Sequence, residues 1–183
     1  MKIRITKKHT FNDIEKYLFP VKQFCEEKKR KGMYDDWNEA DHTAEWITKI
    51  ISSVQNGENG HLNIYYLEEN EKIIGSAFAL INSDITLDAL TRDGIIPDSE
   101  KIAHITCFHI IEAYRGKGRG SSWLIGEIFS DLRAQGVKQV YIKSSHHPAL
   151  SLYERLGTQV GNYISMSDSK LYQRYGYIYR IEL

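Results

Sequence analysis

The sequence predicts an α/β (α+β) fold in which helices flank a mixed sheet. Strand-like segments alternate with amphipathic helical segments along the chain. The segment 102–111 is apolar on both of its alternating faces, which is typical of a central strand that is covered on both sides. The 183 residues contain three prolines and no linker-like stretch, so we expect one domain spanning residues 1–183.

Charge and cysteine content argue against several classes of function. The 24 basic and 24 acidic side chains give a net charge of zero, whereas general nucleic-acid binders carry a basic excess, so we expect no nucleic-acid partner. Cys25 and Cys107 form no Cys-x-x-Cys pair, which argues against a zinc ribbon. Because neither a signal-peptide core nor a run of 18 apolar residues is present, we expect a cytoplasmic protein without a membrane partner.

The first third of the chain predicts one short strand followed by helices. Ile3–Ile5 alternates like a strand, and the stretch from Thr10 to about Lys31 has helical spacing, with Thr10 or Asn12 as its cap. Pro20 lies inside this stretch, so two separate helices are the alternative to one. A second helix is predicted over 41–54, where apolar residues recur every three or four positions.

The remaining two thirds predict a hairpin followed by alternating strands and helices. Strands at 62–67 and 73–80 are joined by the polar turn 68–72. An insert over 82–101 carries a short helix near 85–91. After the strand at 102–111, the expected elements are a helix at 121–135, a strand at 139–143, a helix at 148–156, and strands at 163–165 and 175–181.

The glycine-rich segment Tyr114-Arg-Gly-Lys-Gly-Arg-Gly-Ser-Ser122 carries the strongest chemical signal. It follows the predicted central strand and opens a predicted helix, where free amides and the helix dipole favour an anion such as a phosphate. The dinucleotide pattern G-x-G-x-x-G fails because residue 121 is Ser, and the Walker pattern is absent. The alternative is a glycine-rich turn that binds nothing.

Two segments together resemble the GNAT superfamily of N-acetyltransferases. Arg115-Gly-Lys-Gly-Arg-Gly120 is similar to the family motif R/Q-x-x-G-x-G/A, and His146–Gly157 is similar to its N-x-x-A-x-x-L-Y-x-x-x-G segment. His146 stands where the family usually has Asn, and Thr158 stands where Phe usually follows the Gly. The resemblance covers roughly residues 102–160.

This resemblance implies a mixed, mostly antiparallel central sheet flanked by helices, and an enzyme that moves an acetyl group from acetyl-CoA to an amine in a ternary complex. Backbone amides of the glycine-rich segment would hold the pyrophosphate. The implied contacts to acetyl-CoA are Phe108, His109, Ile110, Arg115, Gly116, Lys117, Gly118, Arg119, Gly120, Ser121, His146 and Ala149.

Two residues are candidates for the transfer chemistry. Tyr153 matches the family tyrosine that protonates the departing thiolate, and a phenol is protonated at neutral pH. His104 is the candidate base, because a histidine titrates near neutral pH. A core tyrosine and a buried structural histidine are the alternatives. His109, five residues after His104, is expected on the opposite face of the strand, and Cys107 is expected in the core.

Metal chemistry is not expected, because the adjacent His146 and His147 diverge and no third ligand stands at a suitable spacing. The acceptor side is predicted from two acidic segments, 35–45 and 82–101, which would attract a small cationic amine beside Tyr34, Trp37 and Trp46. Solvated helix ends are the alternative explanation of these acids.

Two other functions remain open: an inactive CoA-binding sensor, and a protein or peptide N-acetyltransferase. Dimers are common in the family, so a homodimer is a further expectation.

Overall fold

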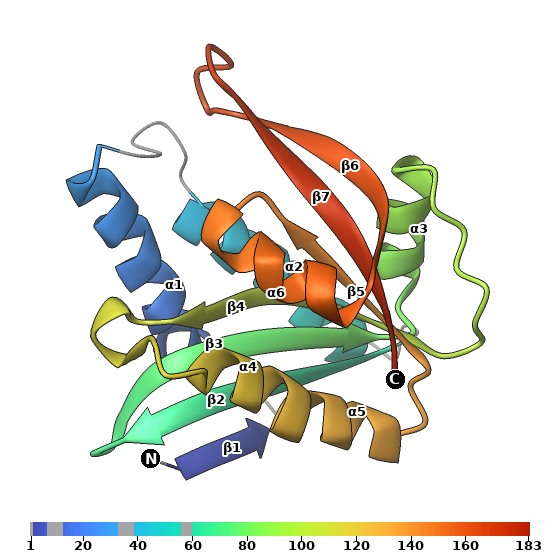
Figure 1. Cartoon of the computed structure of the whole chain (residues 1–183), viewed down its shortest axis with the longest axis horizontal. Helices are drawn as coiled ribbons and strands as arrows, with labels where there is room; N and C mark the ends of the chain where they lie inside the picture. The colour runs from blue at the N-terminus through green and yellow to red at the C-terminus, as the bar shows by residue number, and fades with distance from the viewer. Residues whose placement is uncertain (1, 7–12, 33–38, 56–59) are drawn as a thin grey trace.

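A seven-stranded sheet forms the centre of the molecule (Figure 1). The computed structural model describes residues 2–6, 13–32, 39–55 and 60–183. The strands follow the order β1-β2-β3-β4-β5-β7-β6, and β4–β5 is the parallel pair in a sheet whose other described pairs are antiparallel. The predicted mixed, mostly antiparallel sheet is therefore confirmed. The strands are β1 (Lys2–Thr6), β2 (His61–Glu69), β3 (Lys72–Ile81), β4 (Ile102–Ile110), β5 (Gln139–Ser144), β6 (Thr158–Met166) and β7 (Gln173–Glu182).

Helices cover both faces of this sheet. One face carries α1 (Ile14–Arg30) and α2 (Glu39–Gln55), and the other carries a long helix and α6 (His147–Leu156). The long helix runs without a break through α4 (Arg119–Ser122), the π-helical segment η3 (Trp123–Ile128) and α5 (Phe129–Ala134). The remaining elements are α3 (Asp84–Arg92), beside the β6–β7 end of the sheet, and the short 3-10 turn η2 (Glu112–Tyr114).

The period-two pattern of the strands divides the apolar side chains between two cores. Ile64 and Phe78 pack under α1 and α2, whereas their neighbours Tyr65 and Ala77 belong to the core under the long helix and α6. Burial of both faces explains why β3 has buried residues at every position after its first. β3 therefore has no solvent-facing side, and β4 is buried or half-buried at every position, in line with the prediction for the segment 102–111.

Most predicted elements are confirmed, including the hairpin of β2 and β3 and the short helix in the insert. The division of the first helix at Pro20 is wrong, because α1 continues through that residue. Pro20 removes one amide hydrogen bond, but Leu18, Val21 and Phe24 bury the same helix against the sheet, and this packing outweighs the loss. The proposed caps Thr10 and Asn12 lie outside the described residues. In the ranges that the structure describes, no helix has the length and apolarity to cross a membrane.

Candidate active site

A break in the sheet places the site. β4 and β5 pair in parallel from Ile102–Gln139 to Ile105–Ile142. Beyond that point, β4 has an irregularity opposite β3, where one extra residue is accommodated between the pairs Phe78–Thr106 and Ser76–His109. Cys107 adopts a φ of 53°, in the left-handed region, and the extra residue on β4 identifies a β-bulge at this position. The side chains after a bulge face the side of the sheet opposite to the one that regular alternation predicts.

The bulge overturns the prediction that His104 and His109 point to opposite faces. In a regular strand, side chains five positions apart alternate, but the extra residue at Cys107 shifts the pattern by one. Both histidines consequently face α1 and α2. His109 stacks on Phe24 of α1 with ring centroids 4.4 Å apart, and His104 lies edge-on to Trp46 of α2 at 6.5 Å.

A cavity of about 670 Å³ opens where β4 and β5 separate. Side chains from α1, α2, α3, β4, β5, α6, β6 and β7 form its wall. The residues predicted for the cofactor or the chemistry that line it are His104, Phe108, His109, His146, Ala149 and Tyr153, and Trp46 from the predicted acceptor side lines it as well. Ile110 is buried in the core under the long helix, and the glycine-rich segment lies outside this wall.

The glycine-rich segment forms a tight turn into the long helix. Gly116 and Gly118 have φ values of 94° and 72°, and Lys117 between them has 52°, so three consecutive residues are left-handed. A Cβ at Gly116 would meet no described atom within 4 Å and one at Gly118 would come no closer than 3.6 Å, so conformation rather than space requires glycine. The amides of Gly120 and Ser121 lie in the first helical turn, where the helix itself supplies no acceptor. Such amides can bind a phosphate.

Two of the three basic side chains in this segment are engaged by the protein itself. Arg115 donates from Nε to the carbonyl of Ile110 at 2.6 Å, and Arg119 donates from Nη1 to the carbonyl of Tyr114 at 2.8 Å. Lys117 is exposed. The turn is therefore held from within, and its amides and Lys117 are the groups that remain to meet an anion.

Three histidines and one tyrosine of the cavity wall are held in their neutral forms. Burial lowers the pKa of His104 to about 4, and Lys143 acts in the same direction. Burial also lowers the pKa of His146 to about 4 and that of His109 to about 3, with nearby cations adding to the effect. Burial raises the pKa of Tyr153 well above that of a free phenol. At neutral pH His104, His109 and His146 are therefore uncharged, and Tyr153 is protonated.

These histidines predict that acid destabilises the fold. A histidine with a folded pKa of about 4 takes up its proton on unfolding once the pH falls below about 6.5, so its stabilising contribution is complete above that pH and is lost toward pH 4. For His104 alone the loss between pH 7 and pH 5 amounts to about 2 kcal/mol. Urea unfolding at both pH values should show a smaller decrease in His104→Gln than in the wild type. An identical decrease in both would contradict the shift at His104.

Several residues that line the cavity were not predicted from the sequence. Val21 and Phe24 of α1, Thr43 of α2, and Arg92, Lys143 and Arg174 all line the cavity. These residues come from separate elements, and nothing in their spacing marks them as neighbours. Cys107, expected in the core, packs against the core under α1 and α2 but also lines the cavity. Among the described side chains, no group of three or more His, Cys, Asp or Glu is placed to hold a metal ion.

Comparisons with known proteins agree with this geometry. The family model described as the acetyltransferase (GNAT) family matches residues 22–158. A search of curated proteins finds no matching sequence. Similar solved structures include a protein assigned to the GNAT family from Desulfovibrio desulfuricans, with 14% identity, a TM-score of 0.62 and 99% coverage of both chains.

Two further structures are similar over nearly their whole length. The ribosomal-protein-alanine N-acetyltransferase of Brucella melitensis has 13% identity, a TM-score of 0.60 and full coverage of both chains. A GNAT family acetyltransferase from Elizabethkingia anophelis with acetyl-CoA bound has 14% identity and a TM-score of 0.55, with 100% of this chain and 97% of that one covered. The family match over most of the sequence decides the assignment: this chain is a member of the GNAT family of acetyltransferases.

Proposed function

We propose that this protein transfers the acetyl group of acetyl-CoA directly to a primary amine, with both substrates bound in a ternary complex. The observation that carries the proposal is that residues predicted for the cofactor and for the chemistry, on β4 and α6, line one cavity. His104 and Tyr153 are 49 positions apart in the sequence, and the separation of β4 from β5 brings both to its wall. A shared cavity allows transfer without a covalent enzyme intermediate.

The glycine-rich turn fits the pyrophosphate of acetyl-CoA. It offers first-turn amides at Gly120 and Ser121, and left-handed residues that allow close approach of an anion. His146, at the N-terminus of α6, has a buried Nδ1 that finds no hydrogen-bond partner among the described residues. We assign this nitrogen to a polar group of the pantetheine arm, in the position where the family usually has Asn.

Tyr153 is the proposed donor to the leaving thiolate. Its ring is 4% exposed, and burial raises the pKa of the phenol, so the O–H is present throughout the neutral range. Complete proton transfer to a thiolate, whose conjugate acid has a pKa of about 8.5, is uphill for such a phenol. Tyr153 therefore acts mainly by donating a hydrogen bond to the charge that develops on sulfur.

His104 is the proposed proton acceptor. With a pKa of about 4 it is neutral at pH 7, so it can accept a proton. It is too weak a base to deprotonate a free alkylammonium of pKa about 10.4. We therefore place its action after the amine has attacked the thioester, when the nitrogen is far more acidic, and we expect the acceptor to bind as the neutral amine.

The charges at the wall bear on the acceptor. A small cationic amine is the acceptor that the two acidic segments favour, but none of their described acids lines the cavity, and Asp35 and Asp36 lie outside the described residues. Asp93 is paired with Lys143 at 2.6 Å. The charged residues in the described wall are Arg92, Lys143 and Arg174. Because these wall residues are basic, we propose that the acceptor is an amine that also carries a carboxylate or phosphate, in preference to a polycation.

A peptide amine is the remaining acceptor class, because one similar structure is a ribosomal-protein-alanine N-acetyltransferase. An inactive acetyl-CoA sensor is the alternative to an enzyme, and His146 in place of Asn is the departure that favours it.

A thiol-release assay with an amine panel tests the proposal. We expect kcat/KM to be higher for amino acids or phosphorylated amines than for polyamines. We also expect it to be higher for them than for peptides of the same charge. In the same assay His104→Gln should lower kcat while leaving the affinity for acetyl-CoA unchanged. Preference for polyamines would restore the cationic acceptor. Tight acetyl-CoA binding without transfer to any amine would establish the sensor instead.

A further inference from the structure

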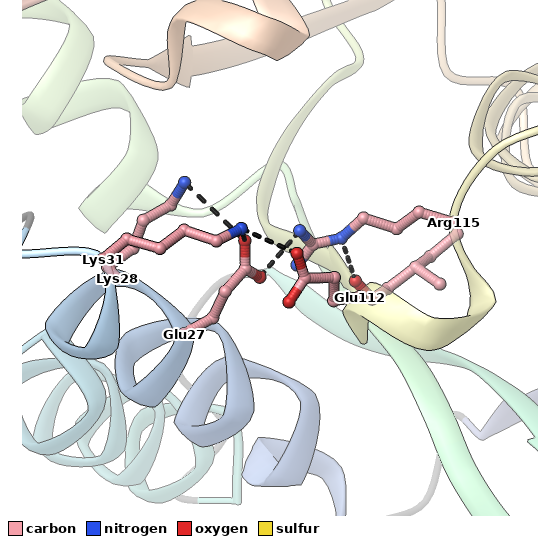
Figure 2. A network of polar contacts seen from close by, with 6 residues as sticks. Glu27, Lys28, Lys31, Glu112 and Arg115 are labelled. Carbon is pink, nitrogen blue, oxygen red and sulfur yellow. Dashed lines mark hydrogen bonds and ion pairs between the residues drawn. The ribbon is translucent and has the colours of Figure 1, made fainter.

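Glu27 of α1 is a buried carboxylate that the transfer chemistry does not use. Its side chain is 3% exposed. Oε2 lies 2.7 Å from Nη1 of Arg115, and Oε1 accepts a hydrogen bond from Lys31 at 2.9 Å. Lys28, which is also buried, lies 4.0 Å away. Figure 2 shows Arg115 reaching from its turn across to α1, where these side chains meet.

The carboxylate is ionised in this setting. Burial alone would raise the pKa of Glu27, but the contacts with Lys31 and Arg115 outweigh burial and hold the pKa below its usual value. A buried charge is tolerated only when it is paired, so the cost of burying Glu27 is offset by these cations. The pairing with Arg115 links residues 88 positions apart in the sequence.

Arg115 is held on two sides. Its Nε donates to the carbonyl of Ile110, at the end of β4, and its Nη1 contacts Glu27. The next residue, Gly116, begins the left-handed stretch of the glycine-rich turn. The position of the Arg115 side chain therefore determines where this turn starts relative to β4 and to α1.

The same helix forms part of the cavity wall. Val21 and Phe24 line the cavity, and Phe24 stands one turn before Glu27. The Phe24 ring stacks on His109 at 4.4 Å and meets His146 edge-on at 5.2 Å. Any shift of α1 at this point would move both Arg115 and the wall beside β4.

We propose that Glu27 is a positioning residue, which holds the start of the acetyl-CoA turn through Arg115 and thereby couples acetyl-CoA affinity to the helix that walls the cavity. The inference rests on the proposed function, in which residues 115–121 bind acetyl-CoA. Because coupling between sites is reciprocal, an acceptor that orders α1 would also tighten acetyl-CoA binding.

The variant Glu27→Gln separates positioning from simple electrostatics. Removing an anion close to the turn would, through charge alone, strengthen the binding of an anionic ligand. Positioning predicts the opposite sign: we expect calorimetry to show acetyl-CoA binding weakened about 10-fold. Arg115→Gln breaks the same pair, and the double variant should bind no more weakly than the weaker single variant, because one interaction cannot be lost twice.

Glu112→Gln is the matched control. It removes one negative charge from the same network, at the Lys31–Glu112 pair of 2.6 Å, but both of these side chains are about half exposed. An exposed pair of this kind contributes little, so the acetyl-CoA affinity should stay within twofold of the wild type. If Glu27→Gln fails to fold, Arg115→Lys takes its place. Lys keeps the positive charge but cannot contact Ile110 and Glu27 at the same time, so acetyl-CoA binding should weaken to the same extent.

The outcomes separate the inference from the proposed function. If the wild type binds acetyl-CoA and a folded Glu27→Gln binds it equally or more tightly, the positioning role is overturned. The positioning role is likewise overturned if Arg115→Lys, tested in its place, keeps the wild-type affinity. If the wild type itself does not bind acetyl-CoA, the proposed function fails first.

Discussion

Replacing Tyr153 with Phe should lower kcat by at least about 100-fold, which is the lower end of the effect of removing one hydrogen-bond donor to a developing negative charge. The phenol is the donor that we place beside the departing thiolate, and burial raises its pKa, so it stays protonated at any pH used for the assay. Phe keeps the ring that packs 5.8 Å from Tyr179. The KM for acetyl-CoA should therefore change little, and steady-state kinetics at saturating substrate measures the effect.

Tyr179→Phe is the matched control for this experiment. Tyr179 is 1% exposed, its ring lies against that of Tyr153, and its buried hydroxyl has no hydrogen-bond partner in the described part of the chain, yet it does not line the cavity. Its loss should leave kcat within twofold of the wild type. A kcat of Tyr153→Phe that equals that of this control would remove Tyr153 from the mechanism.

The second large effect is expected in the glycine-rich turn. Gly118→Glu together with Gly120→Glu should weaken acetyl-CoA binding by at least about 100-fold, or about 2.8 kcal/mol. Gly118 has a φ of 72°, which L side chains adopt at a cost, and Gly120 stands in the first turn of the long helix. Two carboxylates at this position would repel the pyrophosphate and occupy its place.

Gly126→Glu provides the comparison for that double variant. Gly126 lies in the same long helix, within the π-helical segment, and a Cβ there would meet no described atom within 4 Å. It is exposed and does not line the cavity, so the added carboxylate should leave acetyl-CoA affinity close to that of the wild type. Equal losses in both proteins, measured by calorimetry, would show that added charge rather than the turn is responsible.

The order of strands and helices follows from hydrophobic periodicity, because each element buries one or both faces against a neighbour. The strand-like apolar run over 73–80 and the helical spacing over 121–135 both correspond to elements in the structure. The glycine-rich turn is predictable for the same local reason, since its glycines, its basic residues and the start of the helix are contiguous in the sequence. A break at Pro20 is the wrong prediction because the local cost of that proline is smaller than the burial of Leu18, Val21 and Phe24.

The wrong or missing predictions at the site concern residues whose position depends on tertiary structure and not on the local sequence pattern. The bulge at Cys107 changes the facing of every later residue of β4, and no glycine marks it in the sequence. Strand alternation therefore places His109 on the wrong face. In the sequence, Glu27 is one of many charged residues on an amphipathic helix. Its burial depends on the contact with Arg115, which lies far along the chain. Long-range pairing of this kind leaves no signal in spacing.

Titration of the purified wild-type chain with acetyl-CoA tests the central claim most directly. We predict binding in the micromolar range with one molecule per chain, and a higher unfolding temperature in the presence of the ligand, because a ligand that binds the folded state stabilises it. No heat of binding and no shift in unfolding temperature at millimolar acetyl-CoA would contradict the claim that this chain is an acetyl-CoA-dependent enzyme.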